Sequence, residues 1–287
     1  MSPTVKSVSI FSEESSSAYE IVRHSREPKM WIAESARWIA EALARRSTQL
    51  THLSACYIID ASTFLYMALH RPLHMTPEEW KRICASDYPC HEPPEYSHWN
   101  LSPNVGPPSA PYPNWDHLEA LTLTSRLLNP SQEDKAISGI FLKAGQLAKR
   151  MPKLRILEIW NGTNRSYTAG LAPAVAELAA REGHGFIFRY RCPRRSVTAT
   201  LPSLLEFKSL WHFTPSKAVR AVWKEVAAAQ HRRLELSMKY VEGKGFNTGL
   251  AVMEELATRR LVVSRRTWDE IRRGERGQDL VLLAGLD

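Results

Sequence analysis

The sequence predicts an α/β fold in which short parallel strands form one sheet and helices cover its outer face. Two segments within residues 115–162 carry this prediction, because each has the same spacing of apolar residues. That spacing is formed by Leu118, Leu121 and Leu123 in the first segment and by Leu154, Leu157 and Ile159 in the second. The last two apolar side chains of each segment lie two residues apart, which places them on one face of a strand.

The residues between these two strands predict a helix with one apolar stripe. The stripe follows helical spacing through Ile137, Ile140, Phe141, Ala144, Leu147, Ala148 and Met151. A strand, a crossover helix and a parallel strand form the repeating unit of a solenoid, in which each unit buries its apolar face against its neighbours. The predicted fold class is therefore an irregular leucine-rich-repeat-like solenoid, with a parallel sheet and helices on the outer face.

Further elements extend this pattern in both directions. Leu50, Leu53 and Ala55 repeat the spacing after an amphipathic helix at residues 31–43, and residues 58–69 predict a strand end and a helix capped by Asp60 or Ser62. Leu234, Leu236 and Met238 alternate in a strand that follows a helix beginning at Thr214 and Pro215. We predict that the strands ending in Ala55, Leu123, Ile159 and Met238 are adjacent and parallel.

The remaining segments complete the predicted domain organisation. Residues 1–28 are expected to be a flexible lead-in with one short strand, VSIF, and residues 29–287 form the solenoid domain. A proline-rich insertion at residues 84–114 contains eight prolines, which exclude a helix or a central strand there. FIFRY at residues 186–190 is a further strand, and residues 261–263 are a candidate for the last one.

Composition limits the class of protein. The chain of 287 residues carries a formal charge of +8, which favours acidic partners in a general way. It has four cysteines, no secretory signal pattern at its start and no apolar run near the roughly 20 residues of a membrane span. We therefore expect free thiols, no membrane partner, and a cytoplasmic or nuclear location.

No motif points to catalysis, a cofactor or a metal. Cys84, Cys90, His91 and His98 lack the close pairs of a structural zinc site, and no glycine-rich phosphate loop is present. Asp60 and Glu158 are a conceivable carboxylate pair, but a helix cap and a surface position explain them more simply. We therefore predict a protein that is not an enzyme, with no catalytic residues, no cofactor and no metal.

Several segments resemble an uncharacterised F-box-associated, leucine-rich-repeat-like region of F-box proteins from filamentous fungi. The resemblance covers residues 30–270, and its most specific pieces are LTLTS at residues 121–125 and LEIWNG at residues 157–162. It implies a repeat region that holds a protein target, joined to a ubiquitin-ligase core by an F-box. No F-box counterpart is found in residues 1–28, so a ligase core is expected as a partner only if a longer form carries one.

The favoured function is a non-enzymatic protein-interaction scaffold with an unidentified protein target. The alternative is a basic nucleic-acid-associated protein that uses the C-terminal arginines and the strip FRYRCPRR at residues 188–195, although a core strand explains that strip better. The arginine cluster comprises Arg259, Arg260, Arg265, Arg266, Arg272, Arg273 and Arg276.

The predicted partner-binding surface follows from the alternation of side chains along strands. If the apolar residues face inward, one row of side chains crosses the open sheet face. This row comprises Thr122, Thr124, Glu158, Trp160, Ser237 and Lys239. Trp160 is its predicted anchor, because tryptophan is enriched at interface hot spots. The competing interpretation is that the proline-rich insertion or a terminal segment folds over the sheet and buries Trp160 as core.

Overall fold

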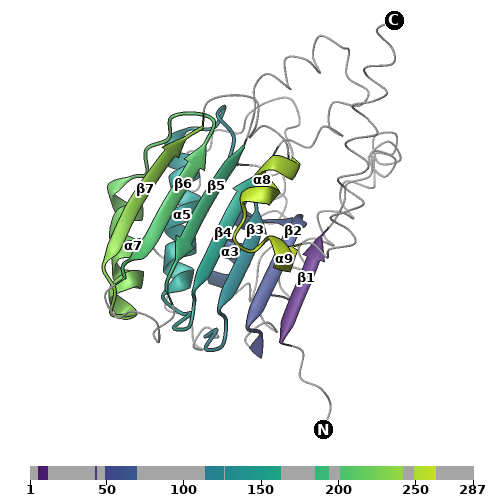
Figure 1. Cartoon of the computed structure of the whole chain (residues 1–287), viewed down its shortest axis with the longest axis vertical. Coiled ribbons are helices and arrows are strands. Elements are labelled where there is room, and N and C mark those ends of the chain that lie inside the picture. The colour runs from purple at the N-terminus through teal and green to yellow at the C-terminus, as the bar shows by residue number, and fades with distance from the viewer. Residues whose placement is uncertain are drawn as a thin grey trace, which may run out of the picture.

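A computed structural model of the chain describes residues 6–11, 43, 49–69, 114–125, 127–162, 185–193, 201–241 and 249–262. Within these residues, seven strands form one open sheet in sequential order (Figure 1). The strands are β1 (Ser7–Phe11), β2 (His52–Asp60), β3 (Ala120–Thr124), β4 (Ile156–Asn161), β5 (Phe186–Arg191), β6 (Ser203–Ser209) and β7 (Leu234–Tyr240). The helices are α3 (Ala61–Leu69), α5 (Asp134–Ala148), α7 (Lys217–Ala229), α8 (Gly249–Glu255) and α9 (Arg259–Val262).

The strand pairing confirms part of the predicted order. β1, β2, β3 and β4 are successive parallel neighbours, and Leu121 lies opposite Leu157. β5 runs antiparallel to both β4 and β6, and β7 is parallel to β6. The prediction that the strand of Met238 adjoins that of Ile159 is therefore wrong, because β5 and β6 lie between them. The fold is mixed α/β, and the reversal at β5 interrupts the uniform strand direction that a leucine-rich-repeat solenoid requires.

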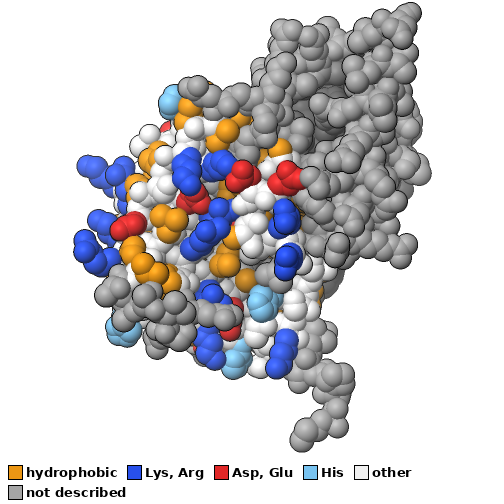
Figure 2. All heavy atoms as spheres, in the orientation of Figure 1, with side chains coloured by type: hydrophobic (Ala, Val, Ile, Leu, Met, Phe, Trp, Pro, Cys, Tyr) orange, Lys and Arg blue, Asp and Glu red, His pale blue; other side chains and the backbone are white. Residues whose placement is uncertain are grey.

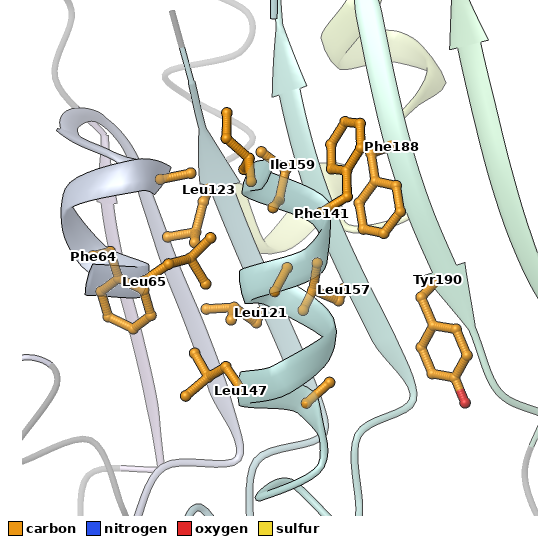
Figure 3. Close-up of a cluster of buried hydrophobic side chains, with 14 of the residues drawn as sticks. Phe64, Leu65, Leu121, Leu123, Phe141, Leu147, Leu157, Ile159, Phe188 and Tyr190 are labelled. Carbon is orange, nitrogen blue, oxygen red and sulfur yellow. The ribbon is translucent and has the colours of Figure 1, made fainter. Parts of the chain in front are cut away.

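One face of the sheet carries the main hydrophobic core. Helices α3, α5 and α7 lie on this face (Figure 1). Every residue of the predicted stripe of α5 is buried, from Ile137 to Met151. Figure 3 shows Phe141 of α5 beside Phe188 of β5, with Leu121, Leu123 and Leu157 of β3 and β4 beside the same helix. The rings of Phe141 and Phe188 are stacked with centroids 4.4 Å apart, an arrangement that adds to the burial of their area.

Several element boundaries differ from the sequence-based expectation. Helix α7 begins later than Thr214, because the side chain of Ser216 caps it by accepting a hydrogen bond of 3.3 Å from the Val219 amide. Asp60 precedes α3, and its carboxylate accepts bonds from the backbone and hydroxyl of Ser62. The candidate strand at residues 261–263 is wrong where the structure describes it, since Arg259–Val262 form α9.

The structure tests other predicted segments only in part. The strand expected at VSIF is present as β1, which pairs with β2. Of the helix predicted at residues 31–43, Leu43 alone is described, and it packs against the core. The insertion at residues 84–114 lies outside the described residues except for Asn114. Among the helices that the structure describes, none is long and apolar enough to cross a bilayer.

The contact between α5 and α7 depends on a glycine, which gives a first prediction. A Cβ added to Gly145 would lie 2.5 Å from Cγ1 of Val222, whereas one added to Gly139 meets nothing within 4 Å. Gly145→Ala should therefore separate the two helices and lower the free energy of unfolding by about 1–3 kcal/mol. Gly139→Ala, in the same helix, should raise it by about 0.5–1 kcal/mol. Urea denaturation of both variants measures the difference, and equal effects would contradict this packing.

A second prediction concerns the burial of Leu157 in β4. Leu157 is fully buried, while Arg155 is partly exposed and forms a 3.5 Å ion pair with Glu119. Leu157→Ala should cost about 2–5 kcal/mol of unfolding free energy. Arg155→Ala should cost less than about 1 kcal/mol, as expected for a solvent-screened ion pair. Equal shifts in the midpoints of thermal unfolding would count against the burial of Leu157 in the core.

Candidate functional site

The second face of the sheet carries one polar side chain per strand at the same level. Registered Cα partners place these residues side by side from β2 to β7. The row consists of Ser54, Thr122, Glu158, Arg189, Glu206 and Ser237. From β2 to β6, their immediate neighbours in each strand point to the aromatic and aliphatic core on the opposite face. A continuous polar row on a sheet face is the feature that most distinguishes this face from the other.

The six residues predicted for partner binding all lie on this second face. Thr124 and Trp160 are registered neighbours in the next row, and the same row reaches Lys239 through β5 and β6. The expectation that all six residues lie on an open face is wrong, however. Thr122, Thr124, Glu158 and Trp160 are buried, while Lys239 is exposed and Ser237 is half-buried. A role of these residues in partner binding stays a prediction.

The cause of this burial is the segment that contains α8 and α9, which packs on the second face over the first strands of the sheet (Figure 1). Trp160 lies at 0% exposure in a small second core with Cys56 and Ile187 of the sheet. Val252, Met253, Leu256 and Val262 complete this core from the covering segment. This is the competing interpretation of Trp160, in which a terminal segment folds over the sheet.

A buried ionic cluster joins the covering segment to the sheet. Glu158, at 0% exposure, accepts a hydrogen bond from the guanidinium of Arg189. It also accepts bonds of 2.9 Å from the backbone amides of Ala257 and Thr258, and a bond from the Thr258 hydroxyl. The Thr258 hydroxyl in turn accepts a 2.8 Å bond from Thr122. Both carboxylate oxygens of Glu158 are therefore occupied, so this group holds a structure together rather than facing a substrate.

Arg189 is shared between two strands and the covering segment. Besides Glu158, its guanidinium donates to Glu206 over 2.9 Å and to the backbone carbonyl of Glu255. Glu206 also pairs with Lys239 at 2.7 Å. Burial raises the pKa of Glu206, but Lys239 and Arg189 outweigh it and hold the pKa below its ordinary value. Glu206 is therefore ionised at neutral pH. Its buried charge is tolerated because Arg189 and Lys239 pair with it.

The cluster also corrects the prediction for the FRYR strip. The core-strand interpretation holds for Phe186 and Phe188, which lie in the core, and Arg191 is exposed, but Arg189 is buried in the ionic cluster. Sequence reasoning missed Arg189, Glu206 and Thr258 as members of this cluster. The available signal was the charged residue at an alternate position of each β-prone run, FIFRY and SLLEFKS.

Two other potentially reactive side chains of the described region, Asp60 and Cys56, are hydrogen-bonded or buried. Asp60 accepts hydrogen bonds from Ser62 and, over 3.0 Å, from Ser125 at the end of β3. Burial raises the pKa of Cys56 to about 12, so its thiol stays protonated at neutral pH. No group of His, Cys, Asp and Glu suited to a metal occurs among the described residues. Cys84, Cys90, His91 and His98 lie outside them.

On the second face, the described residues leave β7 and the region around Arg191 of β5 and Leu204 of β6 uncovered, whereas Ile187, Arg189 and Glu206 are buried. We call the uncovered region the open half-face, and it comprises Arg191, Leu204, Lys208, Glu235, Ser237 and Lys239. Figure 2 shows basic and acidic side chains interspersed with apolar ones on the side of the molecule that contains it. Lys208 pairs with Glu255 at 3.0 Å, so its charge, like that of Lys239, is compensated. Two of the three basic residues of the surface are therefore paired with carboxylates.

Comparison with known proteins gives a family and no function. The model of a family of unknown function, DUF6546, matches residues 1–264 of the chain. No curated protein and no solved structure matches the chain.

The ionic cluster gives a third prediction. Glu158→Gln removes the negative charge that faces Arg189 and three further donors, so it should lower the free energy of unfolding by about 3–5 kcal/mol. Hydrogen exchange in residues 252–262 should accelerate, because their anchor is lost. Glu119→Gln is the matched control, since it breaks the exposed 3.5 Å pair with Arg155 and should cost less than about 1 kcal/mol. Unchanged exchange in the Glu158→Gln variant would contradict the anchoring role.

Proposed function

The chain belongs to the DUF6546 family of unknown function, and we propose that it is a non-enzymatic protein-interaction module that binds its target on the open half-face. The observation that carries this proposal is the unequal covering of the sheet. Helices α3, α5 and α7 cover one face, and the segment with α8 and α9 covers β1–β4 and part of β5 on the other (Figure 1). What remains is an exposed sheet surface that is backed by the aromatic core at β5 and β6, as suits a preformed binding surface.

The side chains of the open half-face suit a protein target. Arg191 and Lys239 supply long amphipathic side chains, and Leu204, which lies between Arg191 and Glu235 in the strand register, supplies apolar area. Arginine is enriched at protein interfaces because its planar group forms several hydrogen bonds and stacks on apolar groups. Of the predicted partner-binding residues, Ser237 and Lys239 lie within this surface.

The charge distribution favours a protein over a nucleic acid as the target. A nucleic-acid surface needs cations that are free to neutralise phosphates. Arg189, Lys208 and Lys239 each contact a carboxylate on this face. The C-terminal arginine cluster lies outside the described residues except for Arg259 and Arg260 of α9.

The sequence resemblance to F-box-associated regions of filamentous-fungal proteins supports a more specific form of this proposal. In that form the open half-face would hold a target for ubiquitin transfer. The chain would then be the target-binding part of an adaptor whose F-box is supplied in a longer form.

A capture experiment with paired variants tests the proposed function. Immobilised parent protein should retain one or more proteins from an extract of the cells that produce it, identified by mass spectrometry. Arg191→Glu, on the open half-face, should reduce this retention at least tenfold, since interface arginines are common hot spots worth about 2 kcal/mol or more. Lys224→Glu changes charge equally on the exposed side of α7 and should leave retention unchanged.

The retained material also separates the alternatives. Equal retention by the two variants would refute the assignment of the open half-face. Retention of nucleic acid that falls steeply with salt would favour the basic nucleic-acid-associated function. Ubiquitin-ligase components among the retained proteins would support the adaptor form.

A further inference from the structure

Strand β7 exposes apolar side chains although it belongs to a well-packed sheet. It is the last strand of the sheet in the described chain and pairs there with β6 alone. Leu236, Met238 and Tyr240 are 41%, 48% and 48% exposed, and with Leu201 they are the large hydrophobic residues most exposed in the described region. The prediction that Leu236 and Met238 are buried is therefore wrong, because no described helix lies beyond α7 to cover them. An apolar strand edge of this kind is a template for pairing with another chain.

The backbone of β7 offers a regular set of hydrogen-bonding groups on its outer side. The carbonyl of Arg233 accepts from Ser203, and the amide of Val241 donates to Ser209, so odd-numbered residues at both ends point toward β6. Alternation along a parallel ladder then directs the amides and carbonyls of the even-numbered residues outward. These residues are Leu234, Leu236, Met238 and Tyr240.

We propose that β7 pairs antiparallel with β7 of a second copy of this chain, about a two-fold axis through Ser237. In this register Leu236 lies opposite Met238 of the copy and Leu234 lies opposite Tyr240, and each pair exchanges the outward-pointing backbone bonds. Glu235 lies opposite Lys239 of the copy, and this pair of opposite charges occurs twice. The strand is self-complementary, as a two-fold interface requires.

Other registers fit less well. A register centred on Leu236 places Arg233 opposite Lys239, two like charges that repel. A register centred on Met238 places Lys239 opposite Ser237 and leaves Glu235 without a charged partner. Both shorten the paired segment, whereas the Ser237 register pairs all seven residues of β7. Charge, length and backbone direction therefore select the same register.

The resulting dimer has one continuous sheet across both copies. A two-fold axis perpendicular to the sheet keeps both α7 helices on one face, where Leu236 and Met238 of the two copies form a common apolar strip. The opposite face joins the two open half-faces into one larger surface. The inference goes beyond the proposed function, because it concerns self-association at the edge and holds whether or not a target binds the face.

Disulfide trapping tests the register directly. Opposed Cα atoms in a non-hydrogen-bonded antiparallel pair are about 4.5 Å apart, within the range of a disulfide. Ser237→Cys should therefore form a covalent dimer on mild oxidation in the full-length chain. Glu235→Cys is the matched control and should not, because its own copy lies about 13 Å away along the strand.

Sedimentation of the unmodified chain and of three variants tests the association itself. The parent should sediment at twice the chain mass of 32.6 kDa. Glu235→Lys places like charges opposite Lys239 at both symmetric positions, and Met238→Lys puts charge into the apolar strip. Each should weaken the dimer at least tenfold. Asp116→Lys makes the same charge change as Glu235→Lys at an exposed position near β3 and should leave the dimer intact.

Three results would overturn the proposal. These are a parent chain that is monomeric up to about 100 µM, trapping of Glu235→Cys in preference to Ser237→Cys, and dimers that Glu235→Lys and Met238→Lys leave unaffected. Target capture is a separate measurement. A monomeric parent that still retains its target refutes the dimer alone, and a dimer that retains nothing refutes the proposed function alone.

Discussion

The arrangement of this sheet depends on the buried charges of Glu158, Arg189 and Glu206. Removing an ionised group from water costs several kcal/mol, and the cost is offset only when every hydrogen-bonding position is filled. Here the filling groups come from three strands and from backbone amides at Ala257 and Thr258. The covering segment is thus required by the charges beneath it, and the charges are tolerated because the segment is present. Either part alone would leave unpaired polar groups in the interior.

The two faces of the sheet have different roles as a result. The aromatic cluster around Phe141 packs α5 and α7 on one face, and few polar contacts accompany it, among them the bond from Trp223 to the Phe141 carbonyl and the bond from the Ser216 amide to the Ser138 hydroxyl. On the other face, hydrogen bonds join the covering segment to the sheet. These bonds are confined to the area that the segment covers. Beyond that area the polar row ends in Ser237 of β7, and Lys239 of the next row lies at the surface. The open half-face is therefore the exposed continuation of a structural motif.

Local patterns were sufficient for much of the fold. The leucine spacing of β3 and β4 and the stripe of α5 predicted their pairing and burial, because alternation and helical spacing depend only on nearby residues. The direction of β5 relative to its neighbouring strands was not predictable in this way. A strand that is buried on both faces reads the same in either direction, so FIFRYR carries no signal of its reversal between β4 and β6.

The sequence by itself determined which side chains share a face: Thr122, Glu158 and Ser237 lie together, as strand alternation requires. Only the tertiary structure decided which of them meet solvent. Glu158 and Trp160 are covered by a segment about 100 residues further along the chain, and no local period encodes contact over such a separation. Exposure of β7 was decided in the same way, since burial of Leu236 and Met238 depends on a neighbouring element that the pattern within the strand cannot specify.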